Sequence, residues 1–294
     1  MGSGLAAAQR PGTTIENTER RTAATVHGAA EIGFAQKDGK TRLTHLYQRN
    51  PMRVLFPEAA SDDLPNAVLV TISGGLVAGD RIDIAVDVGE AAAAHITASA
   101  AEKLYRSTGA TTKIAQQLKI GEGGWLEYLP PESILFDGAR LRRRTVVDLA
   151  PGAGFLGGGI LVFGRRARGE GYTHGLLNEC WEVYRDGTLV WGDALHIEQH
   201  VAAIMGDPAC FDGAEACATL ILAAPGDPHA FVEAAREVQA RFSLRAGVTA
   251  VNGLLVGRWL GEALRLRGAY AELACHLRQA AMGLPPRLPR LWHV

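Results

Sequence analysis

Short strand-like runs recur about every 10 to 12 residues from residue 26 onward, and Gly, Pro or Asp bounds each run. The run Arg81–Val88 shows the pattern best, because Ile and Val alternate with Arg, Asp and Ala at the period of a half-buried strand. Lys113–Ile120 and Leu141–Leu149 alternate in the same way. This rhythm indicates an all-β chain. A sandwich, a barrel and a β-solenoid would all produce it, so periodicity alone leaves the architecture open.

Helical patterns are clear only late in the sequence. Asp227 can cap a helix whose first residue is Pro228, and an apolar stripe at helical spacing follows over residues 231–242. A second helix is expected from about Leu260 to Met282, where Gly283 and two prolines stop it. The predicted fold class is therefore mainly β, with two helices toward the C-terminus.

The organisation expected along the chain is simple. Residues 1–25 show no period, and we expect a disordered leader there. Residues 26–294 show no strong boundary and no sharp repeat, so a single β-rich domain is expected. Asp38-Gly39 and Asp186-Gly187 predict tight hairpin turns, because a type I′ turn needs two residues with positive φ. Val68–Ile72 is a continuous apolar run and is expected to be buried on both faces.

Composition excludes several classes of protein. The 294 residues carry 30 Lys and Arg against 31 Asp and Glu, and a net charge of −1 argues against a broadly polycationic nucleic-acid binder. The 4 cysteines form no C-x-x-C motif. The N-terminus lacks the apolar core of a signal peptide, and no apolar run approaches the roughly 20 residues of a membrane span. We expect a cytoplasmic protein without nucleic-acid or membrane partners.

The glycine-rich segment Gly74–Gly79 raises the question of a phosphate loop. Asp80 and Arg81 follow it in place of the Lys and Ser or Thr of a P-loop. A strand rather than a helix comes next, so the dinucleotide-binding fingerprint does not fit either. A turn between two strands is the prediction, and the chain is not expected to hydrolyse a nucleotide itself.

His196, Glu198 and His200 could form a metal site. On a helix the two imidazoles would share a face, but the glutamate is one place late for the H-E-x-x-H motif. On a strand all three side chains would face one side. A polar strand edge and a metal site both stay open, and a metal-dependent hydrolase at these residues is one alternative function. A generic β-rich binding module is another. The sequence contains no G-x-S-x-G motif, and no catalytic residue is predicted.

Charged and aromatic residues gather at the ends of the strand-like runs. They could form a solvated rim, or they could line a surface or passage for a cation or a protein partner. The candidates for a metal path or a partner interface are Asp80, Glu102, Lys103, Tyr105, Arg106, Glu127, Glu132 and Asp137.

The basic run Arg140–Arg144 lies within one of the predicted strands. Alternation places Arg140, Arg142 and Arg144 on one face, where solvent exposure is expected. Arg143 and Thr145 then share the other face with the apolar residues of the run.

Several stretches in a fixed order carry a family resemblance. Ser73–Arg81 reads G-G-L-x-x-G-D, Ala101–Ser107 contains K-x-Y-R, and Glu127–Ala139 reads E-x-L-P-x-E-x-I-x-F-x-G-A. Leu149–Ala153 and Gly164–Glu170 continue the series. Together they resemble the UreD (UreH) family of urease accessory proteins, and order and spacing fit from about residue 30 to the C-terminus. Relatives often carry an aromatic and an acidic residue shortly after the P-G-A segment, where this chain has three glycines at 157–159.

The resemblance implies a β-helix-like fold with a helical portion and a non-enzymatic role. Proteins of this family bind a second accessory protein, UreF, and through it the GTPase UreG, and the assembly delivers nickel to apo-urease. The expected function is that of a urease maturation factor. Its partners would be UreF, UreG and the urease apoprotein, with transient Ni²⁺ and no tightly bound cofactor. Exposed apolar strands that await a partner are expected to make the chain aggregate alone.

A nickel conduit needs ligands that release the ion again. Imidazole and thiolate hold Ni²⁺ tightly, whereas carboxylates and water guide it and let it leave. The hypothesis is that three acids, Asp80, Glu132 and Asp137, line or border a metal path. The wall of that path or a partner interface would be supported by Lys103, Tyr105 and Arg106.

Overall fold

The computed structural model describes residues 25–293. The leader expected over residues 1–25 lies outside this range apart from Thr25. Most strands belong to two large sheets. The strands of sheet A are β1 (His27–Lys37), β2 (Lys40–Arg49), β5 (Arg81–Val88), β8 (Thr112–Ile120), β11 (Arg140–Leu149), β13 (Leu176–Arg185) and β14 (Thr188–Ile197). They lie in the order β14-β13-β11-β8-β5-β1-β2.

Sheet B contains the remaining strands of the described chain. They are β3 (Met52–Leu55), β4 (Asn66–Thr71), β6 (Ala93–Ala98), β7 (Glu102–Leu104), β9 (Trp125–Tyr128), β10 (Ser133–Leu135), β12 (Gly154–Phe163), β15 (Ala216–Ala223), β16 (Arg245–Val251) and β17 (Leu254–Gly261). The main order is β16-β17-β15-β12-β9-β6-β4-β3, and β7 and β10 extend from β12 at one side.

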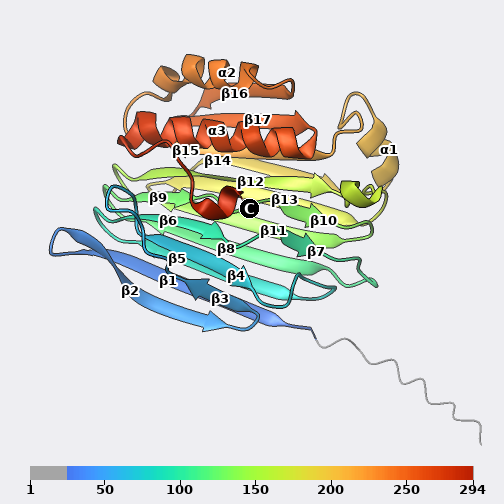
Figure 1. The fold of residues 1–294 in the computed structure, drawn as a ribbon, viewed down its shortest axis with the longest axis horizontal. Coiled ribbons are helices and arrows are strands. Elements are labelled where there is room, and N and C mark those ends of the chain that lie inside the picture. Colours follow the sequence, from blue (N-terminus) through green and yellow to red (C-terminus); the bar gives the residue numbers. More distant parts are fainter. Residues whose placement is uncertain (1–24, 294) are drawn as a thin grey trace, which may run out of the picture.

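The chain winds as a flattened β-solenoid (Figure 1). It passes from sheet A to sheet B and back, with β5 leading to β6, β8 to β9 and β11 to β12. Neighbouring coils therefore pair in parallel, from β1 through β5, β8 and β11 to β13 in sheet A and from β4 through β6 and β9 to β12 in sheet B. Antiparallel strands close both ends of each sheet. The predicted β-helix-like class is confirmed.

The inside of the solenoid is built from side chains that stack in register from coil to coil. On sheet A, one such fully buried row is formed by Val86, Leu118, Val147 and Val183. The short strands β7 and β10 make a narrow third side, where parallel pairing stacks Leu104, Leu135 and Phe163. Burial of these rows supplies the main driving force for stacking the coils.

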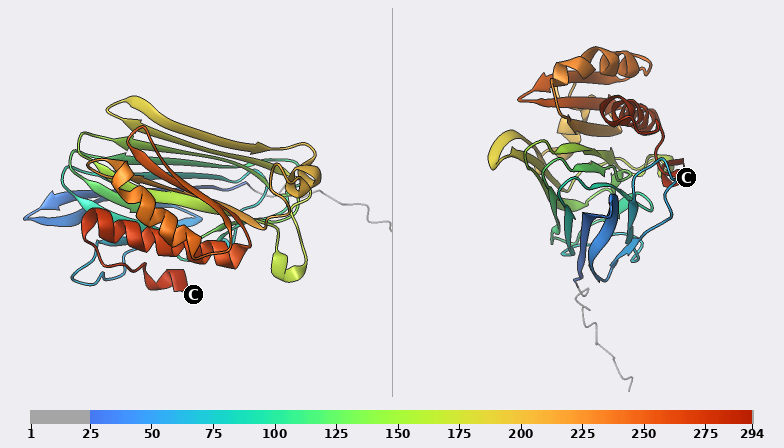
Figure 2. Two further views of the ribbon diagram at one scale, coloured as in Figure 1. Left: turned by 90° about the horizontal axis from the view of Figure 1, so that it is seen from above. Right: turned by 90° about the vertical axis from the view of Figure 1, so that its left-hand side faces the viewer.

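Helices cover the outer face of sheet B at its C-terminal end (Figure 2). The helices that cover it are α2 (Val232–Ala240) and α3 (Ala263–Met282). The short helix α1 (Val201–Gly206) packs instead against the core inside the solenoid. Short 3₁₀ turns are η1 (Arg166–Arg168), η2 (Pro228–Phe231) and η3 (Arg290–His293). The stripe Leu266, Tyr270 and Leu273 of α3 is fully buried against β12, β15 and β17. A second apolar core thus lies between sheet B and the helices.

The predicted end of the second helix at Met282 is confirmed, but α3 begins at Ala263 rather than at about Leu260, which lies in β17. Asp227 accepts a hydrogen bond from the backbone N–H of His229, and Pro228 opens the 3₁₀ turn that leads into α2. Glu262 caps α3, and Gly283 ends it with a φ of 66°. The short helix α1 was not predicted. Within residues 25–293, none of the helices combines the length and the apolar character that a membrane crossing needs.

Two other predictions concern turns and burial. Both residues of Asp38-Gly39 and of Asp186-Gly187 have positive φ, as hairpin turns require. The expected burial of Val68–Ile72 is wrong at its end, because β4 stops at Thr71 and Ile72 is 56% exposed. Exposed apolar side chains also occur on the edge strand β2 and after the edge strand β3, namely Leu43, Leu46, Tyr47, Leu55 and Phe56. Self-association through them stays a prediction.

Candidate functional site

A layer of polar side chains crosses the otherwise apolar lumen of the solenoid. Two adjacent rows of inward-facing residues run across the strands of sheet A and turn from apolar to polar. In the first row, Ile82 and Ile114 are followed by Arg143 and Glu179 on the next strands, and in the second row Ile84 is followed by Gln116 and Thr145. We call the polar groups at this level the lumen layer. Its members are Glu102, Gln116, Tyr128, Ser133, Arg143, Thr145 and Glu179.

An ion pair forms the centre of the lumen layer. Arg143 Nε donates to both carboxylate oxygens of Glu179, at 2.9 and 2.8 Å, and its Nη1 donates to Ser133 Oγ at 2.8 Å. Trp181 Nε1 adds a third hydrogen bond to Glu179 at 3.0 Å. Both charged side chains are 9% exposed. Burial raises the pKa of Glu179 above its ordinary value, although the guanidinium acts in the opposite direction.

Neutral hydrogen bonds complete the layer. Thr145 Oγ1 donates to Gln116 Oε1, and Gln116 Nε2 donates to Tyr128 Oη, each at 2.7 Å. This chain of bonds joins sheet A to β9 of sheet B. Burial raises the pKa of Tyr128, so its hydroxyl stays protonated at neutral pH. A satisfied network of this kind fixes the positions of its members.

Two cavities open beside the lumen layer. The wide cavity, about 380 Å³, lies between β13 and β14 of sheet A and β15 to β17 of sheet B, with Glu179, Trp181 and Gly159 in its wall. The narrow cavity, about 160 Å³, lies toward the N-terminal coils, with Glu102, Gln116 and Tyr128 in its wall. Each cavity therefore has a carboxylate of the lumen layer beside it.

Of the predicted segment 102–106, Glu102 and Lys103 line the narrow cavity. Glu102 accepts a hydrogen bond from Thr71 Oγ1 at 2.7 Å, and burial raises the pKa of its carboxyl. Lys103 is exposed and also lines this cavity. Tyr105 Oη donates to the carbonyl of Gly74 at 3.0 Å, and the ring packs edge-on against Phe136. The next residue, Arg106, points instead to the main-chain carbonyl of Asp137.

Three other predicted acids use their oxygens for contacts outside the two cavities. Asp80 is buried and accepts from the backbone N–H groups of Val26 and Val77, each at 2.9 Å, so it fixes the turn before β5. Glu132 lies 3.1 Å from Arg267 of α3. Asp137 accepts from the N–H and hydroxyl of Thr173, and these bonds lower its pKa despite burial. None of the three lines either cavity. Their assignment to a metal path stays a prediction.

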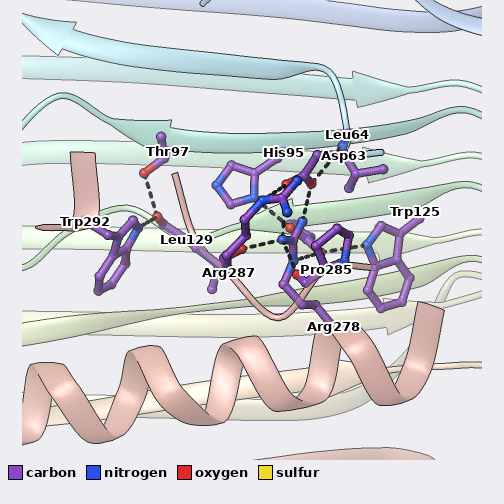
Figure 3. Close-up of polar contacts among 11 residues, drawn as sticks. Asp63, Leu64, His95, Thr97, Trp125, Leu129, Arg278, Pro285, Arg287 and Trp292 are labelled. Atoms are coloured by element: carbon purple, nitrogen blue, oxygen red, sulfur yellow. Dashed lines mark hydrogen bonds and ion pairs between the residues drawn. The ribbon is translucent and has the colours of Figure 1, made fainter. Parts of the chain in front are cut away.

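Glu127, also predicted, belongs to a buried ion cluster beneath α3. Figure 3 shows its partners His95 and Arg278 together with Asp63. His95 Nδ1 lies 2.7 Å from one oxygen of Glu127, and Arg278 Nε donates to the other at 3.1 Å. Arg278 also donates to Asp63 at 2.7 Å and to the carbonyl oxygens of two residues in the segment after α3, Pro285 and Arg287. This cluster lies on the outer face of sheet B, away from the lumen, and ties α3 and the chain after it to the solenoid.

The ion cluster makes stability depend on pH. His95 and Arg278 lower the pKa of Glu127 below its usual 4.5, and they outweigh burial, which raises it. The folded pKa is below the unfolded one, so this stabilisation is present above about pH 4.5 and is lost as pH falls through the folded pKa. We expect the urea concentration at the midpoint of unfolding to decrease as the pH is lowered below 4.5. In Glu127→Gln this decrease with pH should be smaller. The control Glu233→Gln changes an exposed residue and should show the same decrease of the midpoint with pH as the parent. Parallel curves for Glu127→Gln and the parent would contradict this assignment.

The structure separates the three residues of the suggested histidine site. Strand β14 ends at Ile197, so His196, Glu198 and His200 do not share one strand face. Glu198 accepts from Arg140 at 2.8 Å and lies 3.8 Å from His196. His200 adopts a left-handed conformation just before α1. Across residues 25–293, no group of three or more His, Cys, Asp or Glu side chains could hold a metal ion.

Sequence reasoning placed Arg143 on the apolar side of its strand but did not identify the lumen layer. The signal was available in part, because Arg143 and Thr145 interrupt an otherwise apolar inward face. Gln116 gave a similar signal, because it interrupts the apolar face formed by Ile114, Leu118 and Ile120. Glu179 was missed, since its strand had not been predicted from the alternation.

The fold and the site together define a class: a β-solenoid with a polar layer across its lumen, rather than a scaffold around a catalytic pocket. Comparison with known proteins identifies the family. Residues 26–293 match the family described as UreD urease accessory protein, and the chain belongs to this family. A urease accessory protein UreD of Magnetococcus marinus is 41% identical over 279 residues, covering 92% of this chain and 94% of its own. A UreD of a Methylobacterium species is 42% identical, covering 86% and 89%. The UreD 2 protein of Methylorubrum populi is 38% identical, covering 98% and 94%.

These relatives are named as accessory proteins of an enzyme rather than as enzymes. The chain is accordingly an accessory protein, and the alternative of a metal-dependent hydrolase at His196, Glu198 and His200 is not supported.

Proposed function

We propose that this protein is a urease maturation factor that delivers nickel to apo-urease, and that Ni²⁺ crosses the solenoid at the lumen layer. It would act with the accessory protein UreF, with the GTPase UreG bound through UreF, and with the urease apoprotein. Membership of the UreD family supports the role in maturation. The single structural observation that carries the path is a buried polar layer with a cavity on each side of it.

The ligand chemistry around the lumen layer suits transfer better than storage. Glu102 and Glu179 offer carboxylate oxygens, one beside each cavity. Cys217 also lines the wide cavity, but burial raises the pKa of its thiol to about 12, so it stays protonated and is a poor ligand at neutral pH. A cation at this level would meet oxygen ligands that bind it weakly enough to release it.

The first experiment measures nickel per urease active site after expression of the cognate urease operon with and without this chain. We expect nickel to be lost without the chain and to return when the chain is supplied. Full nickel loading in its absence would refute the maturation role.

A second measurement in the same assay tests the path. Glu179→Gln should lower nickel loading at least severalfold, because it removes the charge of the carboxylate and keeps its shape. The matched control is Glu182→Gln, on the outer face of the same strand, where Glu182 pairs with Arg144 at 2.7 Å. A melting temperature for each purified variant separates loss of transport from loss of fold. Equal loading by both variants would place the path elsewhere.

A further inference from the structure

Arg143 occupies the boundary between the two cavities. Among residues 25–293 it is the one residue that lines both of them. Glu179 lies in the wall of the wide cavity only, and Ser133 in the wall of the narrow cavity only. The guanidinium bonds to one residue on each side. Arg143 therefore lies at the place where the two cavities border on the same residue.

The charge of Arg143 opposes passage of a cation. A positive ion in either cavity meets the guanidinium of Arg143, which lines both, and the repulsion is strong in a medium of low dielectric constant. A dication, however, carries twice the charge of the guanidinium, so at the same distance its Coulomb attraction to the carboxylate of Glu179 is twice as strong. A divalent ion can therefore compete for the carboxylate where a monovalent ion gains no such advantage.

Gly159 leaves space beside the guanidinium. A Cβ atom at this position would lie 3.8 Å from Arg143 Nη2 and 3.8 Å from the ring of Trp181, and no other heavy atom lies within 4 Å of it. Gly159 faces the wide cavity, so a guanidinium released from Glu179 has room to move there. At positions 157 and 158, by contrast, a Cβ would meet atoms at 2.4 and 1.9 Å.

We propose that Arg143 is a removable plug: it closes the lumen while paired with Glu179, and a divalent cation opens the path by taking its place on the carboxylate. The proposal rests on the proposed function and adds its regulation. It explains why a conduit for cations contains a buried arginine between its two cavities. The pair of Arg143 and Glu179 is itself electrically neutral at rest.

The test measures Ni²⁺ binding to the purified full chain by isothermal titration. Arg143→Met removes the guanidinium and keeps a side chain of similar length, which leaves Glu179 without its counter-charge. We expect Ni²⁺ to bind about tenfold or more tightly than to the parent, because an uncompensated buried carboxylate gains most from a cation. The gain should disappear in the double variant Arg143→Met, Glu179→Gln.

Arg144→Met is the matched control. Arg144 is the next residue of β11 and pairs with Glu182 through two hydrogen bonds of 2.9 and 2.7 Å, but on the outer face, where its side chain is 60% exposed. Its replacement should leave the affinity for Ni²⁺ at the parent level. A folded Arg143→Met variant with parent affinity would overturn the plug and leave the pair as a structural tie.

If Arg143→Met fails to fold, Gly159→Val provides the test. Valine occupies space beside the guanidinium, because a Cβ atom there lies 3.8 Å from Arg143 Nη2, and it removes neither member of the ion pair. Nickel transfer to urease should then fall while the melting temperature stays at the parent value, and unchanged transfer would overturn the proposal. The deletion experiment keeps the two proposals apart. If urease loads fully with nickel without the chain, the maturation role fails. If nickel loading needs the chain but the Arg143 and Gly159 variants behave like the parent, the plug alone fails.

Discussion

Replacing Arg278 with Met is expected to lower the free energy of unfolding by about 3 to 5 kcal/mol, the usual cost of removing one partner from a buried ion pair. The side chain of Arg278 is 1% exposed and that of Glu127 is fully buried, so the carboxylate cannot recover its lost partner from water. The substitution also removes donors to Asp63 and to the carbonyl oxygen of Pro285. Urea denaturation at neutral pH measures the loss.

A matched exposed pair serves as the control for this experiment. Glu272, on the same helix, lies 2.6 Å from Arg241, and both side chains are at least 40% exposed. Glu272→Gln should therefore cost below about 1 kcal/mol. Similar losses in the two variants would show that the buried cluster contributes no more than a surface ion pair.

Replacing Gly158 with Ala is expected to cost about 3 kcal/mol or more, because the added methyl group has no space. A Cβ atom there would lie 1.9 Å from the main-chain oxygen of Thr219 on the neighbouring strand β15. Backbone cannot move aside as a flexible side chain can, so the β12–β15 ladder must open. Thermal unfolding or urea denaturation of the purified chain measures the effect.

The next residue supplies the control. Gly159→Ala places its methyl group no closer than 3.8 Å to any heavy atom, and strand residues other than glycine lose less entropy on folding. It should be neutral or slightly stabilising. Equal stability of the two alanine variants would mean that β12 and β15 lie farther apart than the structure places them.

The strand rhythm predicted the fold class but not the winding. One inward row runs from Ile82 to Ile114 to Arg143, which are 32 and then 29 residues apart. A coil of about 30 residues contains up to three strand-like runs. The spacing of 10 to 12 residues is therefore the distance from one strand to the next within a coil, and it does not show where each coil begins. The unequal coil lengths explain why the sequence shows no sharp repeat. Parallel pairing between distant coils leaves no local signal in the chain.

The candidate site was predicted less completely than the fold. Alternation identifies two faces of a strand but does not say which face meets a lumen, a helix or water. Glu127 and Tyr128 are adjacent in β9 and both fully buried, yet one faces α3 and the other faces the lumen. The family motif drew attention to Glu127 and Glu132, whereas Glu179 became visible only once β11 and β13 were paired.

The contact between Arg278 and Asp63 also has a consequence for synthesis of the protein. The two residues are 215 positions apart, so Arg278 is synthesised long after Asp63. Trp292 likewise donates to the carbonyl oxygen of Leu129, 163 positions earlier. Contacts over such distances form slowly, because much chain must be ordered before they close. The outer face of sheet B at β6 and β9 therefore stays uncovered during translation, until the ribosome releases the segment that covers it.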